Sequence, residues 1–191
     1  MSVAGLILAA GESRRMGSPK ALLRYRGRTF LDTLIALFCQ RCAPVIVVLG
    51  ADSKVIRGGV SHDATFVFNP DYRTGQTSSM QCGLRALPAG CEGVLFTLVD
   101  HPAVSGATLD ALVAVPRPLI RVPRFEGRRG HPVWFSRALL PEFLALPATG
   151  AARDVVYGHV AETEYLDVAD SGVVSDIDDP EAYSALLGAI L

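Results

Sequence analysis

The first residues that could carry chemistry form a loop near the N-terminus. Positions 8–20 read Leu-Ala-Ala-Gly-Glu-Ser-Arg-Arg-Met-Gly-Ser-Pro-Lys. Gly11 and Gly17 allow the backbone to turn and to approach a ligand closely, while Arg15 and Lys20 bring cations that suit a triphosphate. Five residues separate the glycines, so the loop is neither a Walker A loop nor a G-x-G-x-x-G fingerprint. The residues alone favour an anion-binding loop and leave open an ordinary surface loop with scattered charges.

Carboxylates occur at two further places where phosphate chemistry would need them. Asp100 follows the apolar run 94–99, and four carboxylates lie within residues 175–181. Mg²⁺ prefers such hard oxygen ligands, and phosphoryl transfer commonly uses them. Structural explanations exist for both places, because Asp100 could close the turn before Pro102 and acidic side chains favour helix N-termini.

Two polar segments complete the set of candidates. Residues 77–79 are Thr-Ser-Ser at the predicted start of a helix, where we expect one hydroxyl to cap the free N–H groups. A helix N-terminus can also hold nucleotide oxygens. Residues 128–131 are Arg-Arg-Gly-His in a predicted hairpin, and these cationic and polar side chains suit an anionic partner.

Apolar runs alternate with helix-like stretches through the first half of the chain, and this order predicts what must position these residues. The runs that read as strands are 3–9, 44–49, 64–68 and 93–99. Helical spacing occurs at 29–40, 52–57 and 78–87, with Ser78 and Ser105 as expected N-caps. Such alternation predicts an α/β fold, a three-layer α/β/α sandwich around a mostly parallel, Rossmann-like sheet. Candidate ligands that follow strands would then share one sheet edge.

The second half departs from strict alternation. A hairpin or an excursion from the sheet is expected at 125–130, between apolar runs at 119–124 and 132–135. Further helices are expected at 136–144 and 151–158, late strands at 164–168 and 174–177, and a last helix from Pro180. No internal repeat divides the chain, so we expect residues 1–191 to form a single domain.

Composition excludes several classes of protein. The formal net charge is −1, which gives no reason to expect a nucleic-acid partner. No apolar run approaches the ~18 residues that cross a bilayer. No basic segment precedes the apolar N-terminus, so we expect an unprocessed cytoplasmic protein. Cys39 and Cys42 form a lone C-x-x-C that closes an apolar segment, which favours packing over a metal site.

The loop at 8–20 resembles the signature L-A-A-G-x-S-x-R-M-G-x-x-K of the MobA-like nucleotidyltransferases. This group contains the molybdenum cofactor cytidylyl- and guanylyltransferases. The resemblance implies the nucleotide-diphospho-sugar transferase type of fold and a loop that wraps a triphosphate, with Arg15 and Lys20 in catalytic contact with phosphates. The nucleotide-binding residues that it implies are Leu8, Ala9, Ala10, Gly11, Ser13, Arg15, Lys20, Thr77, Ser78 and Ser79.

Three other segments resemble elements of the same family, in the family's order. Residues 77–84 are similar to T-S-S-x-x-x-G-L, which contacts base and ribose in cytidylyl-type relatives. Asp100 matches the metal-binding aspartate of D-x-P. Residues 176–182 resemble D-I-D-T-P-E-D, with Asp179 in place of the threonine and Ala182 in place of the final acid, and this implies Asp178, or otherwise Asp176, as a second ligand for Mg²⁺. Residues 130–133 resemble G-H-P-V, which lies by the acceptor and implies acceptor-binding roles for Arg129, Gly130 and His131.

The resemblance implies a Mg²⁺-dependent transfer of CMP from CTP to the phosphate of molybdopterin, with release of pyrophosphate. The Ala-Ala-Gly spelling at 9–11 is typical of cytidylyl-type members and favours CTP over GTP. The same chemistry on a sugar phosphate, methylerythritol phosphate or phospholactate, or with GTP or ATP, remains an alternative. An alternative of another class is a non-catalytic accessory that delivers molybdenum cofactor to an apo-enzyme. A client molybdoenzyme or its maturation factor would be the protein partner.

Overall fold

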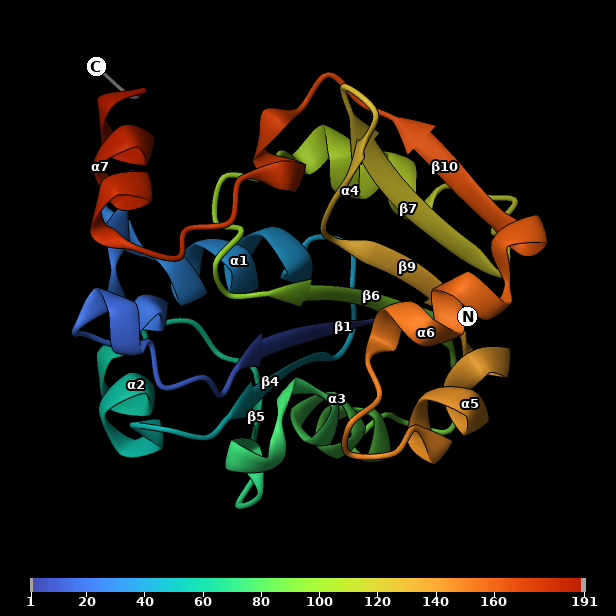
Figure 1. Ribbon diagram of the computed structural model, residues 1–191, viewed down its shortest axis with the longest axis horizontal. Helices are drawn as coiled ribbons and strands as arrows, with labels where there is room; N and C mark the ends of the chain where they lie inside the picture. Colours follow the sequence, from blue (N-terminus) through green and yellow to red (C-terminus); the bar gives the residue numbers. More distant parts are fainter. Residues whose placement is uncertain (1, 190–191) are drawn as a thin grey trace.

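A computed structural model describes residues 2–189, whose centre is one twisted eight-stranded sheet (Figure 1). Its strands, in spatial order, are β10 (Thr163–Asp167), β7 (Ile120–Phe125), β9 (Val133–Ser136), β6 (Cys91–Leu98), β1 (Ser2–Ala9), β4 (Val45–Leu49) and β5 (Thr65–Phe68). The short β8 (Arg128–Arg129) pairs with β7, and β2 (Arg24–Tyr25) with β3 (Arg28–Thr29) forms a separate two-stranded ribbon.

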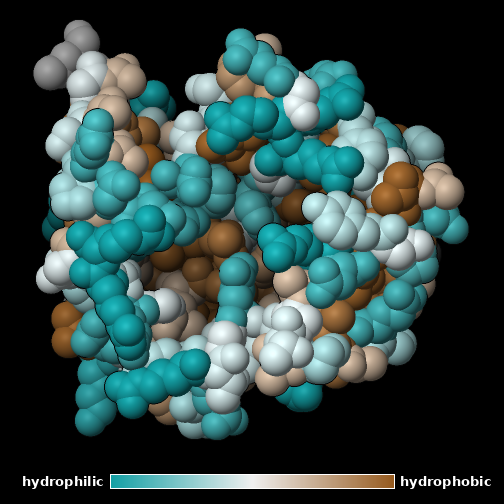
Figure 2. Space-filling view, in the orientation of Figure 1, coloured by the Kyte–Doolittle hydropathy of each residue, from teal (hydrophilic) through white to brown (hydrophobic). Residues whose placement is uncertain are grey.

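The central strands are parallel, and their register places the candidate residues. β1 pairs in parallel with β4 and β6, and Leu8 lies opposite Leu98. The loop that follows β1 and the residues that follow β6 therefore leave the sheet side by side. In the view of Figure 1 the surface is hollowed beside the carboxyl end of β1, and hydrophobic residues floor the hollow (Figure 2). β9 is antiparallel to both β6 and β7, so the sheet is mixed rather than wholly parallel.

Helices cover both faces of the sheet, as buried parallel strands require. α1 (Phe30–Cys39), α4 (Gly106–Val113) and α7 (Pro180–Gly188) contribute to the core on one face, with α2 (Ser53–Gly59) beside them. α3 (Gln76–Arg85), α5 (Leu140–Ala145) and α6 (Ala152–Gly158) cover the other face. The predicted three-layer α/β/α sandwich is confirmed.

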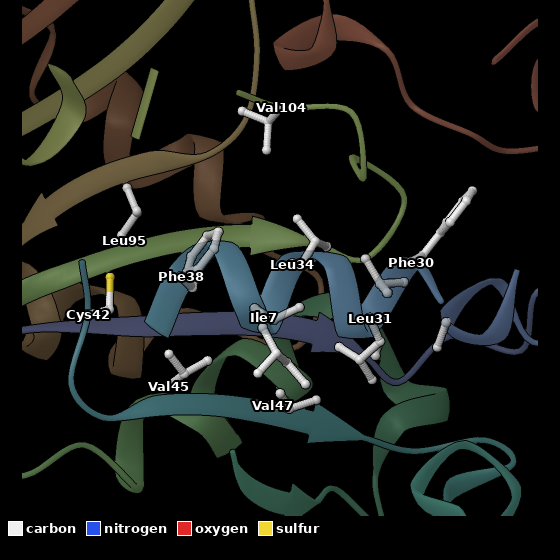
Figure 3. Packing of buried hydrophobic residues seen from close by; sticks show 14 of the residues in the cluster. Ile7, Phe30, Leu31, Leu34, Phe38, Cys42, Val45, Val47, Leu95 and Val104 are labelled. Carbon is white, nitrogen blue, oxygen red and sulfur yellow. The ribbon is translucent and has the colours of Figure 1, made fainter. Parts of the chain in front are cut away.

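Each central strand buries alternate residues in opposite cores, which explains its continuous apolar sequence. Ile7 lies in the first core and Leu6 in the second, and both are fully buried. Figure 3 shows Leu34 and Phe38 of α1 above Ile7 in the first core. Those positions belong to the helical pattern expected at 29–40. Cys42 is buried in the same core, as expected for packing, whereas Cys39 is exposed.

The predicted hairpin and last helix are confirmed, and two other predictions are wrong. β8 pairs with β7, and α7 begins at Pro180. Ser78 is not an N-cap: α3 begins after Gly75, whose φ of 130° suits glycine, and the Ser78 hydroxyl donates to the carbonyls of Asp71 and Gly75. By contrast, Ser105 accepts from the Thr108 N–H as predicted.

Residues 174–177 do not form the predicted strand. A 3₁₀ turn, Ser171–Val174, ends there, and an irregular segment follows. Val173 and Ile177 are apolar because they pack in the first core, and the Ile177 N–H donates to the Asp100 carbonyl at 2.9 Å. Packing without strand pairing produced the misleading pattern. Within residues 2–189, the helices all fall short of the length and apolarity that crossing a membrane requires.

Candidate active site

The loop after β1 is fixed by its own backbone and by one hydroxyl. Ser13 and Gly17 both have left-handed backbone conformations, with φ of 49° and 66°. The Ser13 Oγ accepts from the Lys20 N–H at 3.0 Å, which closes the loop and starts the 3₁₀ turn Lys20–Leu22. Ser13 therefore positions Lys20. A Cβ at Gly11 would meet no atom within 4 Å, so close backbone packing does not explain that glycine.

Four charged side chains from three distant segments meet beside this loop. Lys20 Nζ lies 3.2 Å from Asp100 Oδ2 and also donates to Asp178. Arg15 Nη2 lies 2.5 Å from the other oxygen of Asp178. The hydrogen bond from Lys20, together with the one from Arg15, holds the pKa of Asp178 below its ordinary value. The two carboxylates thus lie within reach of one ammonium group.

The C-terminal segment owes its place to contacts on both sides of Asp178. On one side, the Ile177 N–H bonds to the Asp100 carbonyl. On the other, the Asp179 carboxylate accepts from the Ala182 N–H and caps α7. The acidic residues of this segment therefore have different contacts. Asp179 caps the start of α7, while Asp178, rather than Asp176, contacts Lys20.

A first cavity lies over these charges and has a volume of about 340 Å³. It contains most of the residues expected to bind nucleotide or metal. Those that line it are Leu8, Ala9, Ala10, Gly11, Ser13, Arg15, Lys20, Ser79, Asp100 and Asp178. Gln76 also lines it, which sequence reasoning missed because no match to the family motif marked that position.

Thr77 and Ser78 do not lie in this cavity. The Thr77 hydroxyl donates to the Gly150 carbonyl at 2.5 Å, and Thr77 lines the second cavity instead. Ser78 bonds to the carbonyls of Asp71 and Gly75, as described above. None of the three hydroxyls caps α3, so the expectation of a capping hydroxyl is wrong. Ser79, which does line the first cavity, accepts from the Asn69 amide at 3.0 Å.

The second cavity, of about 400 Å³, adjoins the first and contains the predicted acceptor residues. Arg129, Gly130 and His131 line it, and Phe96, Phe135 and Phe143 provide apolar walls. Arg153 and Tyr157 of α6 line it as well. The sequence predicts that helix but neither of these two residues, because nothing in it indicates that α6 lies beside the hairpin.

The β7–β8 hairpin is anchored to the C-terminal segment. The His131 N–H donates to the Val173 carbonyl at 2.8 Å. A Cβ on Gly130 would lie 2.0 Å from that carbonyl oxygen, so only glycine fits. The Arg129 guanidinium lies 4.6 Å from the centre of the Tyr165 ring, a cation–π contact that directs it across the hairpin.

Buried His101 and half-buried His131 lie between Asp100 and the second cavity. The His101 Nε2 is 3.7 Å from Asp100 Oδ1, and the rings of His101 and His131 are 5.0 Å apart. Burial lowers the pKa of His131 to about 3, with a smaller effect from His101, so His131 is neutral near pH 7. A neutral imidazole can position a ligand by hydrogen bonding but carries no charge to offset an anion.

The carboxylates fit a hard divalent cation. Asp100 Oδ1 is buried and has no hydrogen-bond partner in the part of the chain that the structure describes. Within residues 2–189 no three His, Cys, Asp or Glu side chains group closely enough to hold a metal by themselves. Mg²⁺ sites that bind nucleotides commonly use one or two protein carboxylates, with phosphate oxygens and water as further ligands. Asp100 and Asp178 match that donor set.

Comparisons with known proteins show the family of the chain. Residues 5–163 match the model of the MobA-like NTP transferase domain. The chain is 32% identical to the purine catabolism protein PucB of Bacillus subtilis, covering 97% of this chain and 96% of that protein. It is 31% identical to the nicotine blue oxidoreductase of Paenarthrobacter nicotinovorans (97% and 96%) and 25% identical to the molybdenum cofactor cytidylyltransferase of Escherichia coli (93% and 92%).

A solved structure gives the same fold. Rv0371c of Mycobacterium tuberculosis, in complex with manganese, superposes with a TM-score of 0.85 at 29% identity, covering 99% of this chain and 100% of that one. Divalent metal therefore occurs in a structure that shares this fold.

Proposed function

Because the chain belongs to the MobA-like NTP transferase family, and is thus a nucleotidyltransferase, we propose that it transfers CMP from CTP to the phosphate of molybdopterin and releases pyrophosphate. One observation carries the proposal. A cavity lined by Arg15, Lys20 and Asp100 adjoins a cavity lined by Arg129 and His131. Two substrates could therefore bind at once with their reacting groups at the junction.

On the nucleotide side, we assign Arg15 and Lys20 to the triphosphate. Both side chains pair with Asp178 in this structure, so binding of nucleotide would exchange carboxylate partners for phosphate oxygens. Asp100 and Asp178 would hold Mg²⁺, which when bound polarises the phosphoryl group and offsets charge on the leaving pyrophosphate. Lys20 donates to Asp178, which favours Asp178 over Asp176 as the second ligand.

On the acceptor side, we assign the second cavity to the molybdopterin. Its apolar walls suit a flat heterocycle, and Arg129 supplies a cation for an anionic group. His131, which is neutral, would orient the acceptor by a hydrogen bond rather than act as a base. A phosphate acceptor is already ionised at pH 7 and needs no general base. Positioning of the substrates and electrostatic stabilisation of the transition state would therefore supply most of the rate enhancement.

The preference for CTP depends on the amino-acid sequence of one short segment. Ala9 and Ala10 precede Gly11 and line the first cavity. Relatives with cytidylyltransferase and guanylyltransferase names match this chain at 25% and 30% identity, so identity alone does not choose the nucleotide. The Ala-Ala-Gly sequence at residues 9–11 is what favours CTP.

Pyrophosphate release tests the proposal directly. Purified protein with Mg²⁺ would receive CTP, GTP or ATP in turn, each with molybdopterin, methylerythritol phosphate, phospholactate or a sugar phosphate. We expect release with CTP and molybdopterin, and its loss when EDTA removes the metal. Activity confined to GTP, or to another acceptor, would contradict the substrate assignment while retaining the class of reaction.

A second candidate deserves a test because two relatives at 31–32% identity have names that describe purine catabolism and an oxidoreductase rather than nucleotidyl transfer. In this alternative the chain delivers molybdenum cofactor to an apo-enzyme without chemistry of its own. Deletion of the gene would then abolish the activity of a client molybdoenzyme, whereas Asp100→Ala would leave it unchanged. We expect Asp100→Ala to match the deletion.

A further inference from the structure

Gln76 stands where the two cavities meet. Only two of the described residues line both cavities, Gln76 and Leu98. Leu98 ends β6, two residues before Asp100, and its side chain is a hydrocarbon. Gln76 is the first residue of α3 and is exposed. Its amide is therefore the one hydrogen-bonding side-chain group that the described residues place at the boundary.

The first turn of α3 separates the cavities and is held firmly. Ser79 lies on the side of the first cavity, while Thr77 and Met80 line the second. Thr77 bonds to the Gly150 carbonyl and Ser79 to the Asn69 amide, so neighbouring segments fix this turn from both sides. A group on a rigid helix turn keeps a more precise position than one on a loop.

Other amides on the chain have structural partners. The Gln81 amide, later on α3, donates to the carbonyls of Phe143 and Leu146 and ties α3 to the end of α5. Gln81 lines neither cavity. The exposed amide of Gln76 is thus distinguished by its place between the cavities, and not by its residue type.

In the proposed nucleotidyl transfer, the transferred group must cross this boundary. An acceptor oxygen forms a bond to the α-phosphorus, the bond from that phosphorus to the bridging oxygen of the β-phosphate breaks, and pyrophosphate leaves with the electron pair. Negative charge gathers on the non-bridging oxygens of the transferred group, where a fixed N–H donor is most effective. Glutamine provides two N–H donors without adding charge.

We propose that Gln76 is a catalytic residue whose amide donates a hydrogen bond to a non-bridging oxygen of the transferred α-phosphate. The assignment rests on the proposed nucleotidyl transfer, although its first test needs no acceptor. Gln76→Glu replaces the donor by a carboxylate of nearly the same size. That carboxylate would repel the α-phosphate of CTP. Pyrophosphate corresponds to the β- and γ-phosphates alone, so it has no α-phosphate for the carboxylate to repel.

Isothermal titration with Mg²⁺ compares these two ligands. We expect Gln76→Glu to weaken CTP binding by about tenfold or more, as a like charge at close range would, and to leave pyrophosphate binding unchanged. Gln40→Glu, on the exposed end of α1, adds the same charge far from both cavities and serves as the matched control. Equal losses for both ligands, or no loss for CTP, would overturn the assignment.

Turnover supplies the second test. We expect Gln76→Ala to lower kcat by about 10²-fold, the cost of removing one such donor, with little change in the KM for CTP, and Gln40→Ala to keep wild-type rates. Wild-type kcat in Gln76→Ala would overturn the catalytic role. If no acceptor supports transfer by the wild type but the binding contrast holds, the assignment of Gln76 to the α-phosphate stands and the proposed acceptor fails.

Discussion

At the scale of single residues, Lys20 has the most consequential position in the site. Its ammonium group contacts Asp100 and Asp178, and its own N–H is held by Ser13. The side chain is mostly buried, at 13% exposure, so its interactions are less screened than those of a surface lysine. Replacing it would leave two carboxylates close together without their shared cation.

Lys20→Ala and Asp100→Ala should each abolish turnover while the fold stays intact. The first removes a proposed triphosphate cation, and the second removes a proposed metal ligand. Pyrophosphate release measures turnover, and circular dichroism with thermal unfolding checks the fold. Lys54→Ala, which removes an exposed lysine on α2, is the matched control and should keep full activity. Rates within a few-fold of wild type would contradict the assignment of the substituted residue.

His131 should make the folded state sensitive to acid. Its pKa falls from an ordinary 6.5 to about 3 on folding, because burial disfavours the charged ring. Between those values the unfolded chain binds a proton that the folded chain does not. Stability is therefore full above pH 6.5 and declines as the pH falls toward 3, by at most about 1.4 kcal/mol per unit.

Denaturant unfolding at several pH values would measure this effect. His131→Asn cannot take up the proton, so its stability should depend less steeply on pH between 6.5 and 3 than that of the wild type. Burial also lowers the pKa of the neighbouring His101, which faces His131 and keeps part of the slope in the variant. Identical slopes for wild type and variant would show that His131 does not control the acid response.

At the scale of elements, the β7–β8 hairpin depends on contact with the C-terminal segment. Gly130→Ala would bring a Cβ within 2.0 Å of the Val173 carbonyl oxygen, which is backbone and cannot rotate away. We expect a loss of about 2–4 kcal/mol, typical of severe overpacking, and weaker binding of acceptor because Arg129 and His131 move with the hairpin. Chemical denaturation and acceptor titration measure the two effects.

The matched control is Gly58→Ala, inside α2, where an added Cβ would meet no atom within 4 Å. Alanine favours a helix over glycine, so this variant should be as stable as the wild type or more stable by up to about 1 kcal/mol. If Gly130→Ala were equally harmless, the hairpin would not need the close approach to Val173.

Elements with strong local signals were predictable from the sequence, and long-range contacts were not. The first four apolar runs correspond to β1, β4, β5 and β6. Strands that are buried on both faces consist mostly of consecutive apolar residues, so the sequence predicts them directly. The antiparallel position of β9 between β6 and β7 depends on how the second half of the chain packs, and no local pattern encodes it.

The same distinction holds for the site. Lys20, Asp100 and Asp178 could be named because their segments match a family's motifs. The predicted capping role of Ser78 was wrong, because α3 begins after Gly75 and the Ser78 hydroxyl donates to nearby carbonyls. The Thr77 hydroxyl donates to the Gly150 carbonyl, 73 residues away, a contact that no local pattern indicates. Gln76, Arg153 and Tyr157 could not be found at all, because only the folded chain shows which cavity they line.

At the scale of the whole molecule, one sheet edge collects residues from the full length of the chain. Arg15 and Asp178 are 163 residues apart in sequence and in contact in space. Parallel β1 and β6 bring the loop of Lys20 beside Asp100, and the C-terminal segment returns to the same edge before α7 begins. The second cavity opens beside the first because β9 and the hairpin continue the sheet past β6.

This arrangement predicts direct transfer within a complex of both substrates. Because the cavities adjoin at Gln76 and Leu98, the acceptor can attack the α-phosphate without a nucleotide first being attached to the protein. Initial rates measured at several concentrations of each substrate should give intersecting lines in double-reciprocal plots. Incubation with α-labelled CTP in the absence of acceptor should leave no label on acid-precipitated protein. Parallel lines together with retained label would instead reveal a covalent intermediate on a side chain, which would contradict the adjoining roles of the two cavities.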